Sequence, residues 1–212
     1  DAVEPVNEVL GDRVDLKVVD NLRPQMDKEN LLPAREAIHE LFLQHVMQQA
    51  PGYGKLMTWT STGIMSTPNA VGKIIQTIAD QMNINVLAVD IGGATTDVHS
   101  VTDGSPEWTS RMIEPEPHAK RTVEGDLGVY INAHNILDQV DENGHPASLD
   151  ELRAIPETPT QKELTHWLCE KAVNIGVRRH AGVVTDLYTP SGKKQIVKGK
   201  DLTAVKWIVG TG

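Results

Sequence analysis

A Gly-Gly turn flanked by aspartates and threonines is the part of the chain best suited to chemistry. Residues 86–89 predict a buried strand that ends at Asp90, and residues 96–101 predict a second strand that returns from the turn. Gly92 and Gly93 have no side chains, so the backbone N–H groups of the turn can approach an anion closely. A turn that donates to phosphate, beside a carboxylate that can hold hydrated Mg²⁺, indicates a nucleotide site.

The turn differs from two common phosphate-binding motifs. The chain has no G-x-x-x-x-G-K-[ST] sequence, and its Gly-Gly pair leads into a strand, whereas the dinucleotide fingerprint leads into a helix. The turn resembles the second phosphate loop of the actin-like ATPase superfamily, in which an Asp-x-Gly-Gly-x-Thr turn between two strands grips the β- and γ-phosphates. An ordinary hairpin turn in a mixed sheet is the alternative, but a hairpin does not need two acids and two threonines.

Composition narrows the class of protein. The 212 residues suffice for one large domain or two small ones, and the net charge of −9 argues against nucleic acid or an anionic membrane as the partner. Cys169 is the only cysteine, which excludes an internal disulfide and favours a reducing compartment; its helical surroundings indicate an inert thiol. The sequence has no apolar run of membrane-spanning length and no signal peptide, so we expect a soluble, cytoplasmic protein.

Hydrophobic periodicity predicts an α/β order of elements around the turn. The predicted strands are residues 16–19, 86–89, 96–101, 107–113 and 206–209, with a hairpin of residues 183–189 and 195–197. The predicted helices begin after Pro33, at Thr67, at Glu124–Gly125–Asp126 and at Thr160, where Glu163 completes a capping box. The last helix is predicted to end near Gly182, and residues 141–158 read as a polar connection.

The likeness to actin-like ATPases implies a ribonuclease H-like α/β fold, a mixed sheet flanked by helices with a helical and hairpin insertion. It also implies four segments. They are the end of a first lobe with its connecting helix (1–82), the phosphate-binding core of a second lobe (83–140), the insertion (141–203), and a return strand with a truncated adenosine turn (204–212). Because the chain starts at Asp1 and stops inside a glycine turn, we read it as an excerpt of a longer protein.

The remaining polar candidates are weaker. The histidines form no H-E-x-x-H or Cys/His ligand spacing, so no transition-metal site is predicted, and His99 reads as a polar neighbour of the sheet. Lys120 and Arg121 could steer phosphate, although a solvated basic pair is the simpler interpretation. The acids at residues 124–126 could cap a helix, or Glu124 could lie beside a nucleotide ribose.

A second resemblance covers nearly the whole chain. It is carried by the segments 18–21, 33–38, 67–68, 90–101, 103–104, 115–117, 119–128, 188–192, 199–203 and 210–212. Together they are similar to the MutL-type accessory proteins of adenosylcobalamin-dependent glutamate (methylaspartate) mutase and related aminomutases. That family is unrelated to the mismatch-repair protein with the same name. The runs 90–101 and 119–128 are the most specific parts of the match.

This resemblance implies an ATP-dependent chaperone that reactivates a mutase by releasing damaged cobalamin, with ATP and Mg²⁺ as cofactors. Asp90 would hold Mg²⁺ through water, and Asp97 would help polarise the attacking water. The residues that would contact the nucleotide are Gly92, Gly93, Ala94, Thr95, Thr96, Glu124, Gly125, Gly210, Thr211 and Gly212. The first phosphate loop of the superfamily, an Asp-x-Gly-[ST] turn, is missing from the chain.

Two other functions are compatible with the turn. A kinase or an ATP-dependent hydantoinase or oxoprolinase-like amidohydrolase carries a similar Asp-x-Gly-Gly-x-Thr-Asp turn. A polymerising actin-like structural protein is the other alternative, and it would need filament surfaces that the sequence does not identify. Fold alone does not discriminate among them. The run 119–128 and the hairpin sequence 189–192 favour the accessory protein.

Overall fold

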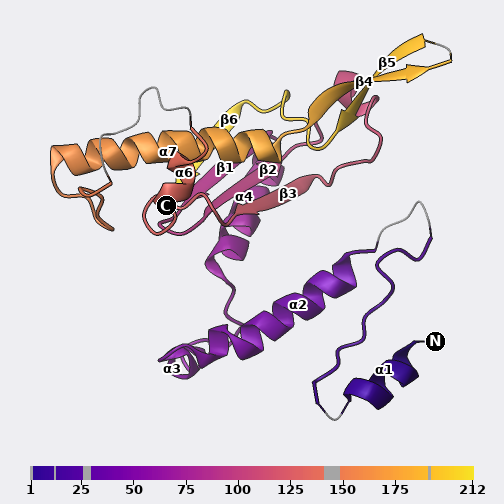
Figure 1. The fold of residues 1–212 in the computed structure, drawn as a ribbon, viewed down its shortest axis with the longest axis vertical. Coiled ribbons are helices and arrows are strands. Elements are labelled where there is room, and N and C mark those ends of the chain that lie inside the picture. Colours follow the sequence, from indigo (N-terminus) through magenta and orange to yellow (C-terminus); the bar gives the residue numbers. More distant parts are fainter. Residues whose placement is uncertain (1, 12, 26–29, 141–148, 191) are drawn as a thin grey trace. The chain divides into compact units, whose positions relative to one another are not determined.

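The computed structural model describes residues 2–11, 13–25, 30–140, 149–190 and 192–212 (Figure 1). The chain divides into two compact units, Asp1–Ile64 and Met65–Gly212. The first unit contains α1 (Val3–Leu10), α2 (Leu32–His45), a 3-10 helix (Met47–Gln49) and α3 (Tyr53–Met57). The helix predicted after Pro33 is confirmed as α2, but the strand predicted at residues 16–19 is wrong, because that segment pairs with no strand.

The second unit is built on a four-stranded mixed sheet. Its strands are β1 (Val86–Ile91), β2 (Thr96–Val101), β3 (Ala119–Glu124) and β6 (Trp207–Thr211), in the order β3-β2-β1-β6. β2 runs antiparallel to β1 and to β3, whereas β6 runs parallel to β1. The predicted strands on either side of the Gly-Gly turn are therefore confirmed, and the α/β class with a mixed sheet is correct.

The third strand lies later in the chain than predicted. Residues 107–113 contain the short helix α5 (Pro106–Thr109) instead of a strand. Pro106 fixes the backbone angle that a first helical turn needs, which favours this helix. β3 follows ten residues later, and its pairing with β2 is a tertiary contact that the sequence pattern did not reveal.

Helices cover both faces of the sheet. On one face α4 (Thr67–Met82) packs Ile75 and Ala79 against the core residues Val86, Ala88 and Val101. Residues at alternate positions of a strand point to opposite faces. Accordingly the other face presents Leu87, Val89 and Val98, which pack with partly buried residues of α7 (Pro159–His180). The sheet is thus the middle of three layers.

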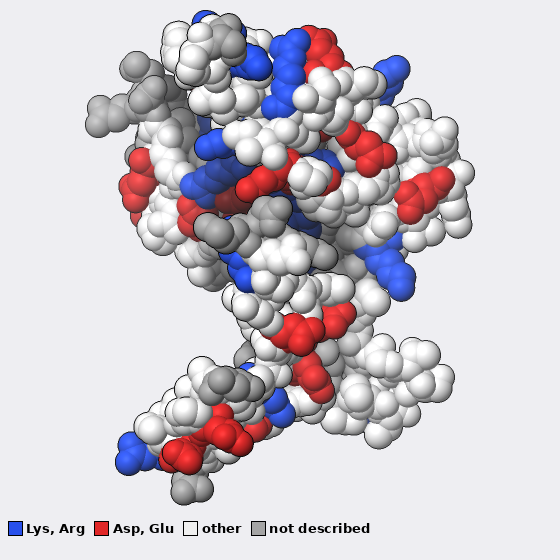
Figure 2. All heavy atoms as spheres, turned by 90° about the vertical axis from the view of Figure 1, so that its right-hand side faces the viewer, with Lys and Arg blue, Asp and Glu red and all other residues white. Residues whose placement is uncertain are grey.

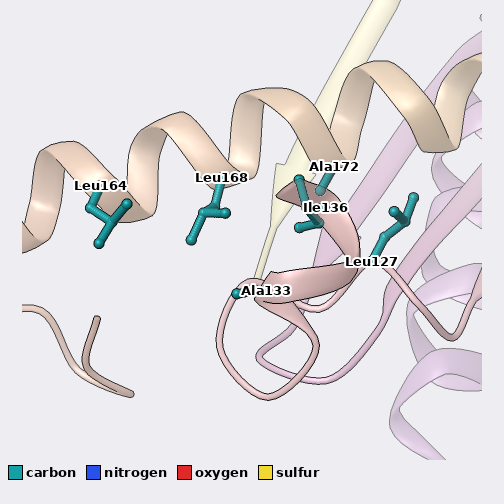
Figure 3. Packing of buried hydrophobic residues seen from close by; sticks show 6 residues of the cluster. All are labelled: Leu127, Ala133, Ile136, Leu164, Leu168 and Ala172. Atoms are coloured by element: carbon teal, nitrogen blue, oxygen red, sulfur yellow. The ribbon is translucent and has the colours of Figure 1, made fainter. Parts of the chain in front are cut away.

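A third cluster anchors α7 to the segment after β3. Figure 3 shows three α7 side chains opposite side chains from α6 (Ala133–Leu137) and the loop before it. The buried members of this cluster are Leu127, Ala133, Ile136, Leu164, Leu168 and Ala172. Burial of this apolar surface joins α7 to the chain that immediately follows β3.

The structure corrects the starts of two predicted helices. Residues 124–126 end β3 and enter a turn, and the helix that follows is only α6, so no helix begins at Glu124. The last helix begins at Pro159, where Thr158 and Gln161 form the capping box instead of Thr160 and Glu163. Proline at the first helical position accounts for this shift of two residues.

The remaining elements complete the second unit. The predicted hairpin is confirmed as β4 (Val183–Thr189) and β5 (Gly192–Lys198), which extend away from the sheet (Figure 1). Residues 141–148 of the predicted polar connection lie outside the described residues, and residues 149–158 contain no helix or strand. The two units meet in sequence at residues 64 and 65, whereas the scheme drawn from sequence had its first boundary after residue 82.

Among the helices that the structure describes, none combines the length and hydrophobicity that a bilayer crossing requires. On the face drawn in Figure 2, Lys and Arg side chains lie among Asp and Glu side chains.

Candidate functional site

The ends of four strands meet at one edge of the sheet. Ile91 at the end of β1 lies opposite Thr96 at the start of β2, and Thr96 in turn lies opposite Glu124 at the end of β3. Because β6 is parallel to β1, its last residue, Thr211, lies beside Asp90. The residues predicted to bind nucleotide, which are far apart in the sequence, are therefore gathered along one edge.

The Gly-Gly turn presents free backbone donors at this edge. The turn is closed by the Gly92 N–H, which donates to the Thr95 carbonyl at 2.8 Å. Within the described part of the chain, the N–H groups of Gly93, Ala94 and Thr95 have no acceptor. Gly93 and Ala94 are exposed to solvent. Three successive donors of this kind can hold an anion such as phosphate.

A second loop donates hydrogen bonds to the carbonyl groups of the turn. Val129 donates its N–H to the Gly92 carbonyl at 3.1 Å, and the N–H groups of Tyr130 and Ile131 both donate to the Gly93 carbonyl, at 2.9 and 2.7 Å. The Asn132 side-chain amide completes the set, because its Nδ2 donates to the carbonyls of Ala94 at 2.7 Å and Gly125 at 2.9 Å. Residues 125–132, called the support loop below, therefore fix the orientation of the turn.

Two carboxylates lie next to the turn on the α4 face of the sheet. Asp90 and Asp97 are directly opposite each other on β1 and β2, so their side chains share that face. Asp90 is half-buried and Asp97 is buried. The described residues contain no cluster of three or more His, Cys, Asp or Glu that could ligate a metal ion. Two carboxylates suit a hard cation that keeps most of its water ligands, as Mg²⁺ does.

Asp97 has a basic partner that sequence reasoning did not find. Arg121 on β3 donates from Nε to Asp97 Oδ1 at 2.7 Å, and its Nη1 donates to Asn69 Oδ1 at 3.1 Å. The interpretation of Lys120 and Arg121 as a solvated pair is therefore wrong, since Lys120 also pairs with Glu116 at 2.9 Å. Strand alternation could have placed Arg121 on the same face as Asp97, had β3 been predicted correctly.

The two threonines of the turn have different environments. Thr95 is partly exposed, whereas Thr96 is fully buried and its hydroxyl donates to the Leu127 carbonyl at 2.7 Å. Thr96 thus joins β2 to the support loop, and its hydroxyl is turned to the interior. Of the two hydroxyls that were expected to hold phosphate, only that of Thr95 can reach solvent in this structure.

Glu124 and Asp126 are held by Arg179 near the C-terminal end of α7. Arg179 Nη1 lies 2.7 Å from Glu124 Oε2 and 2.8 Å from Asp126 Oδ1. The hydrogen bond from Arg179 lowers the pKa of Asp126. Glu124 was expected beside a ribose, but its carboxylate is engaged by this arginine, while Gly125 is exposed and offers its carbonyl to Asn132.

The glycines at the end of the chain lie beside β1. Gly210 and Thr211 belong to β6 and pair with Val89 and Asp90, so these two residues lie in the strand and not in the turn that was predicted for them. Gly212 has φ of +125°, and a Cβ there would overlap the Ile91 carbonyl. Only glycine fits this close approach to the end of β1.

His99 lies between the sheet and α4. It is 3% exposed, and a Cβ on Gly72 would lie 3.0 Å from its Nδ1, so the helix approaches the ring closely because residue 72 is glycine. Burial lowers the pKa of His99, and the nearby positive charge of Arg121 lowers it further. Its Nε2 is buried and has no hydrogen-bond partner among the residues that the structure describes. His99 also lines a cavity of about 410 Å³ between α4 and the strands β2 and β3.

Comparison with known proteins assigns the family. The model of the family described as "MutL protein" matches residues 1–212, the whole chain. The chain belongs to the MutL family. Protein MutL of Clostridium tetanomorphum is 33% identical to it over 219 residues, covering 92% of this chain and 47% of the relative. The chain therefore spans about half the length of that curated relative. The search of solved structures gave no match.

One prediction concerns how this MutL family member stabilises the support loop. Replacing Arg179 by Met leaves the Glu124 carboxylate, whose side chain is 10% exposed, without its basic partner. Because Arg179 itself is 38% exposed, water offsets part of the loss, and we expect a decrease of about 1–2 kcal/mol in the free energy of unfolding. Urea denaturation would measure it.

The adjacent arginine provides the control for this substitution. Arg178 is exposed on the same helix, so Arg178→Met should change the free energy of unfolding by less than about 0.5 kcal/mol. Equal losses in the two variants would show that the ion pairs of Arg179 do not stabilise the fold.

Proposed function

We propose that the full-length protein binds Mg²⁺-ATP at the sheet edge and acts as an ATP-dependent reactivating partner of adenosylcobalamin-dependent glutamate mutase. The observation that carries the proposal is the Gly-Gly turn, in which three successive N–H groups, none of them with an acceptor among the described residues, lie between two facing carboxylates. This donor set fits a nucleotide triphosphate with hydrated Mg²⁺, because amide donors match phosphate oxygens and carboxylates match metal-bound water.

Each residue at the edge has a role in this proposal. The N–H groups of Gly93, Ala94 and Thr95 hold phosphate oxygens, and the Thr95 hydroxyl can add a further hydrogen bond. Asp90 holds Mg²⁺ through water. Asp97 orients the water that attacks the γ-phosphate and also accepts a hydrogen bond from water bound to Mg²⁺. ATP, when bound, supplies the free energy of hydrolysis for a conformational change. The backbone of residues 210–212 lies beside the adenosine.

The sheet topology supports an actin-like assignment. The resemblance implied a mixed sheet flanked by helices, with the phosphate turn between two strands and a late return strand. The order β3-β2-β1-β6, with β6 parallel to β1 and with α4 and α7 on opposite faces, agrees with that expectation. The actin-like superfamily changes the angle between two lobes during its ATP cycle, and we propose the same conformational change here.

Family membership supports the choice of partner. The match to the MutL family extends over the whole chain. It includes the run 119–128, which favours an accessory protein over kinases and amidohydrolases with similar turns. A radical mutase that holds damaged cobalamin needs a partner that opens it, and ATP binding and hydrolysis supply the energy for opening. Reactivation therefore accounts for a nucleotide site in a protein of this family.

Calorimetric titration of Mg²⁺-ATP into the full-length protein tests the proposal. We expect saturable binding that becomes at least about tenfold weaker in Asp90→Ala, because that carboxylate helps to hold the metal. Asp138→Ala, which removes an exposed carboxylate after α6, is the matched control and should bind like the parent. The absence of binding by the parent, or unchanged binding by Asp90→Ala, would overturn the nucleotide site.

A second experiment addresses the partner. Glutamate mutase inactivated with cobalamin in place should release it faster when the full-length protein and Mg²⁺-ATP are added together than with either alone. Turnover of a sugar or a cyclic amide without an effect on the mutase would instead favour a small-molecule enzyme. An increase in light scattering with ATP would favour a polymerising protein.

A further inference from the structure

Arg121 holds only one of the two oxygens of Asp97. Its Nε donates to Oδ1 at 2.7 Å, and in the part of the chain that the structure describes Oδ2 has no hydrogen-bond partner. Asp97 is 4% exposed, so only a small part of the residue reaches solvent. A charged hydrogen bond to one oxygen of a buried carboxylate restricts the rotation of the group and leaves the other oxygen for a further ligand.

The guanidinium is itself fixed at a second point. Its Nη1 donates to Asn69 Oδ1 at 3.1 Å, and Asn69 lies in the first turn of α4. Arg121 thus connects three elements: β3, which carries it, β2, which carries Asp97, and α4. Such an arrangement needs a planar group whose separate N–H donors point in fixed directions, which arginine has and lysine lacks.

We infer that Arg121 is a positioning residue of the nucleotide site, which orients Asp97 so that its free oxygen accepts a hydrogen bond from water bound to Mg²⁺. The inference rests on the proposed function, since it concerns the metal that accompanies the nucleotide. Groups that orient a ligand of a metal site commonly change metal affinity about 10- to 100-fold when they are replaced. The effect of Arg121 should therefore depend on Mg²⁺, whereas a purely structural ion pair would affect ATP binding with and without the metal alike.

The test measures the affinity of the full-length protein for ATP twice, in excess Mg²⁺ and in EDTA. Arg121→Lys keeps a positive charge near Asp97 but cannot contact Asp97 and Asn69 in the same way. We expect its affinity in EDTA to equal that of the parent and the gain in affinity on adding Mg²⁺ to fall about tenfold. Asn69→Ala should give a smaller decrease of the same kind, because only the second anchor of the guanidinium is lost.

Lys120→Met is the matched control, since Lys120 precedes Arg121 on β3 but pairs with Glu116. It should keep the dependence on Mg²⁺ of the parent. The inference is overturned if Mg²⁺ increases the ATP affinity of Arg121→Lys and Asn69→Ala as much as it increases that of the parent. It is also overturned if the two variants lose as much ATP affinity in EDTA as they lose in Mg²⁺. Thermal unfolding identifies a variant that fails to fold, in which case Asn69→Ala decides.

The outcome separates this inference from the proposed function. If the parent binds Mg²⁺-ATP and Asp90→Ala does not, the proposed nucleotide site is supported regardless of the result for Arg121→Lys. If the parent does not bind ATP at all, the proposed function itself fails, and the inference fails with it.

Discussion

Replacing Gly128 by alanine is expected to destabilise the protein by about 3 kcal/mol or more, because a methyl group there has no room. A Cβ on Gly128 would overlap the backbone of Ala94, within the Gly-Gly turn. Backbone atoms cannot move aside as a flexible side chain can, so the support loop would have to separate from the turn. The hydrogen bonds from Val129 and Tyr130 to the turn would then lengthen or break.

Gly125→Ala in the same loop is the control. A Cβ at Gly125 has no atom within 4 Å, so this substitution should leave the free energy of unfolding within about 0.5 kcal/mol of the parent. Chemical denaturation of both variants measures the difference. A Gly128→Ala variant as stable as Gly125→Ala would mean that the support loop does not pack on the turn as described.

Lowering the pH from 6.5 to 4 is expected to decrease the free energy of unfolding by about 3 kcal/mol, because His180 binds a proton more readily in the unfolded chain. This residue is fully buried at the end of α7, and burial, assisted by the positive charges of Lys120 and Lys200, lowers its pKa to about 4. Its ring nitrogens lie 2.7 Å from Ser100 Oγ and 2.9 Å from Thr122 Oγ1. The unfolded chain, with an ordinary histidine pKa near 6.5, binds a proton in this interval, whereas the folded protein does not.

The free energy of unfolding should therefore be at its full value above pH 6.5 and fall as the pH is lowered toward 4. His99, whose pKa is also lowered, acts in the same direction. His118 acts in the opposite direction, because its hydrogen bond with Asp103 raises its pKa, but its side chain is 45% exposed and contributes little. Denaturation at several pH values measures the slope.

His180→Gln should flatten this pH dependence, whatever it does to stability at neutral pH. His166→Gln is the matched control, since His166 is exposed on the same helix and should leave the slope unchanged. If the slope between pH 6.5 and 4 is the same in the parent and in His180→Gln, the buried histidine does not account for it.

The parts of the site that were predictable from sequence are those set by local signals. An apolar run, a glycine pair and a returning strand identify β1, the turn and β2 without knowledge of any distant contact. The positions of Asp90 and Asp97 on one face follow from that hairpin alone, because paired residues of antiparallel strands share a face. The family resemblance likewise depended on motifs that can be read along the chain.

The parts that were missed depend on contacts between distant segments. Arg121 and Asp97 are 24 positions apart, and their pairing requires β3 to lie beside β2. The support loop contains no periodic pattern, so nothing in the sequence showed that its amides bind the carbonyls of Gly92 and Gly93. Thr96 was expected to contact phosphate because its hydroxyl lies beside the turn, yet that hydroxyl donates its hydrogen bond to the Leu127 carbonyl.

The carbonyls of the turn have a consequence for the thermodynamics of binding. The support loop engages the carbonyls of Gly92, Gly93 and Ala94, and the opposed N–H groups are left in place before any ligand arrives. The conformational entropy of the turn is thus lost when the protein folds and need not be lost again on association. Under the proposed function, nucleotide should encounter a preorganised turn, and any ordering that accompanies its binding should occur elsewhere in the protein.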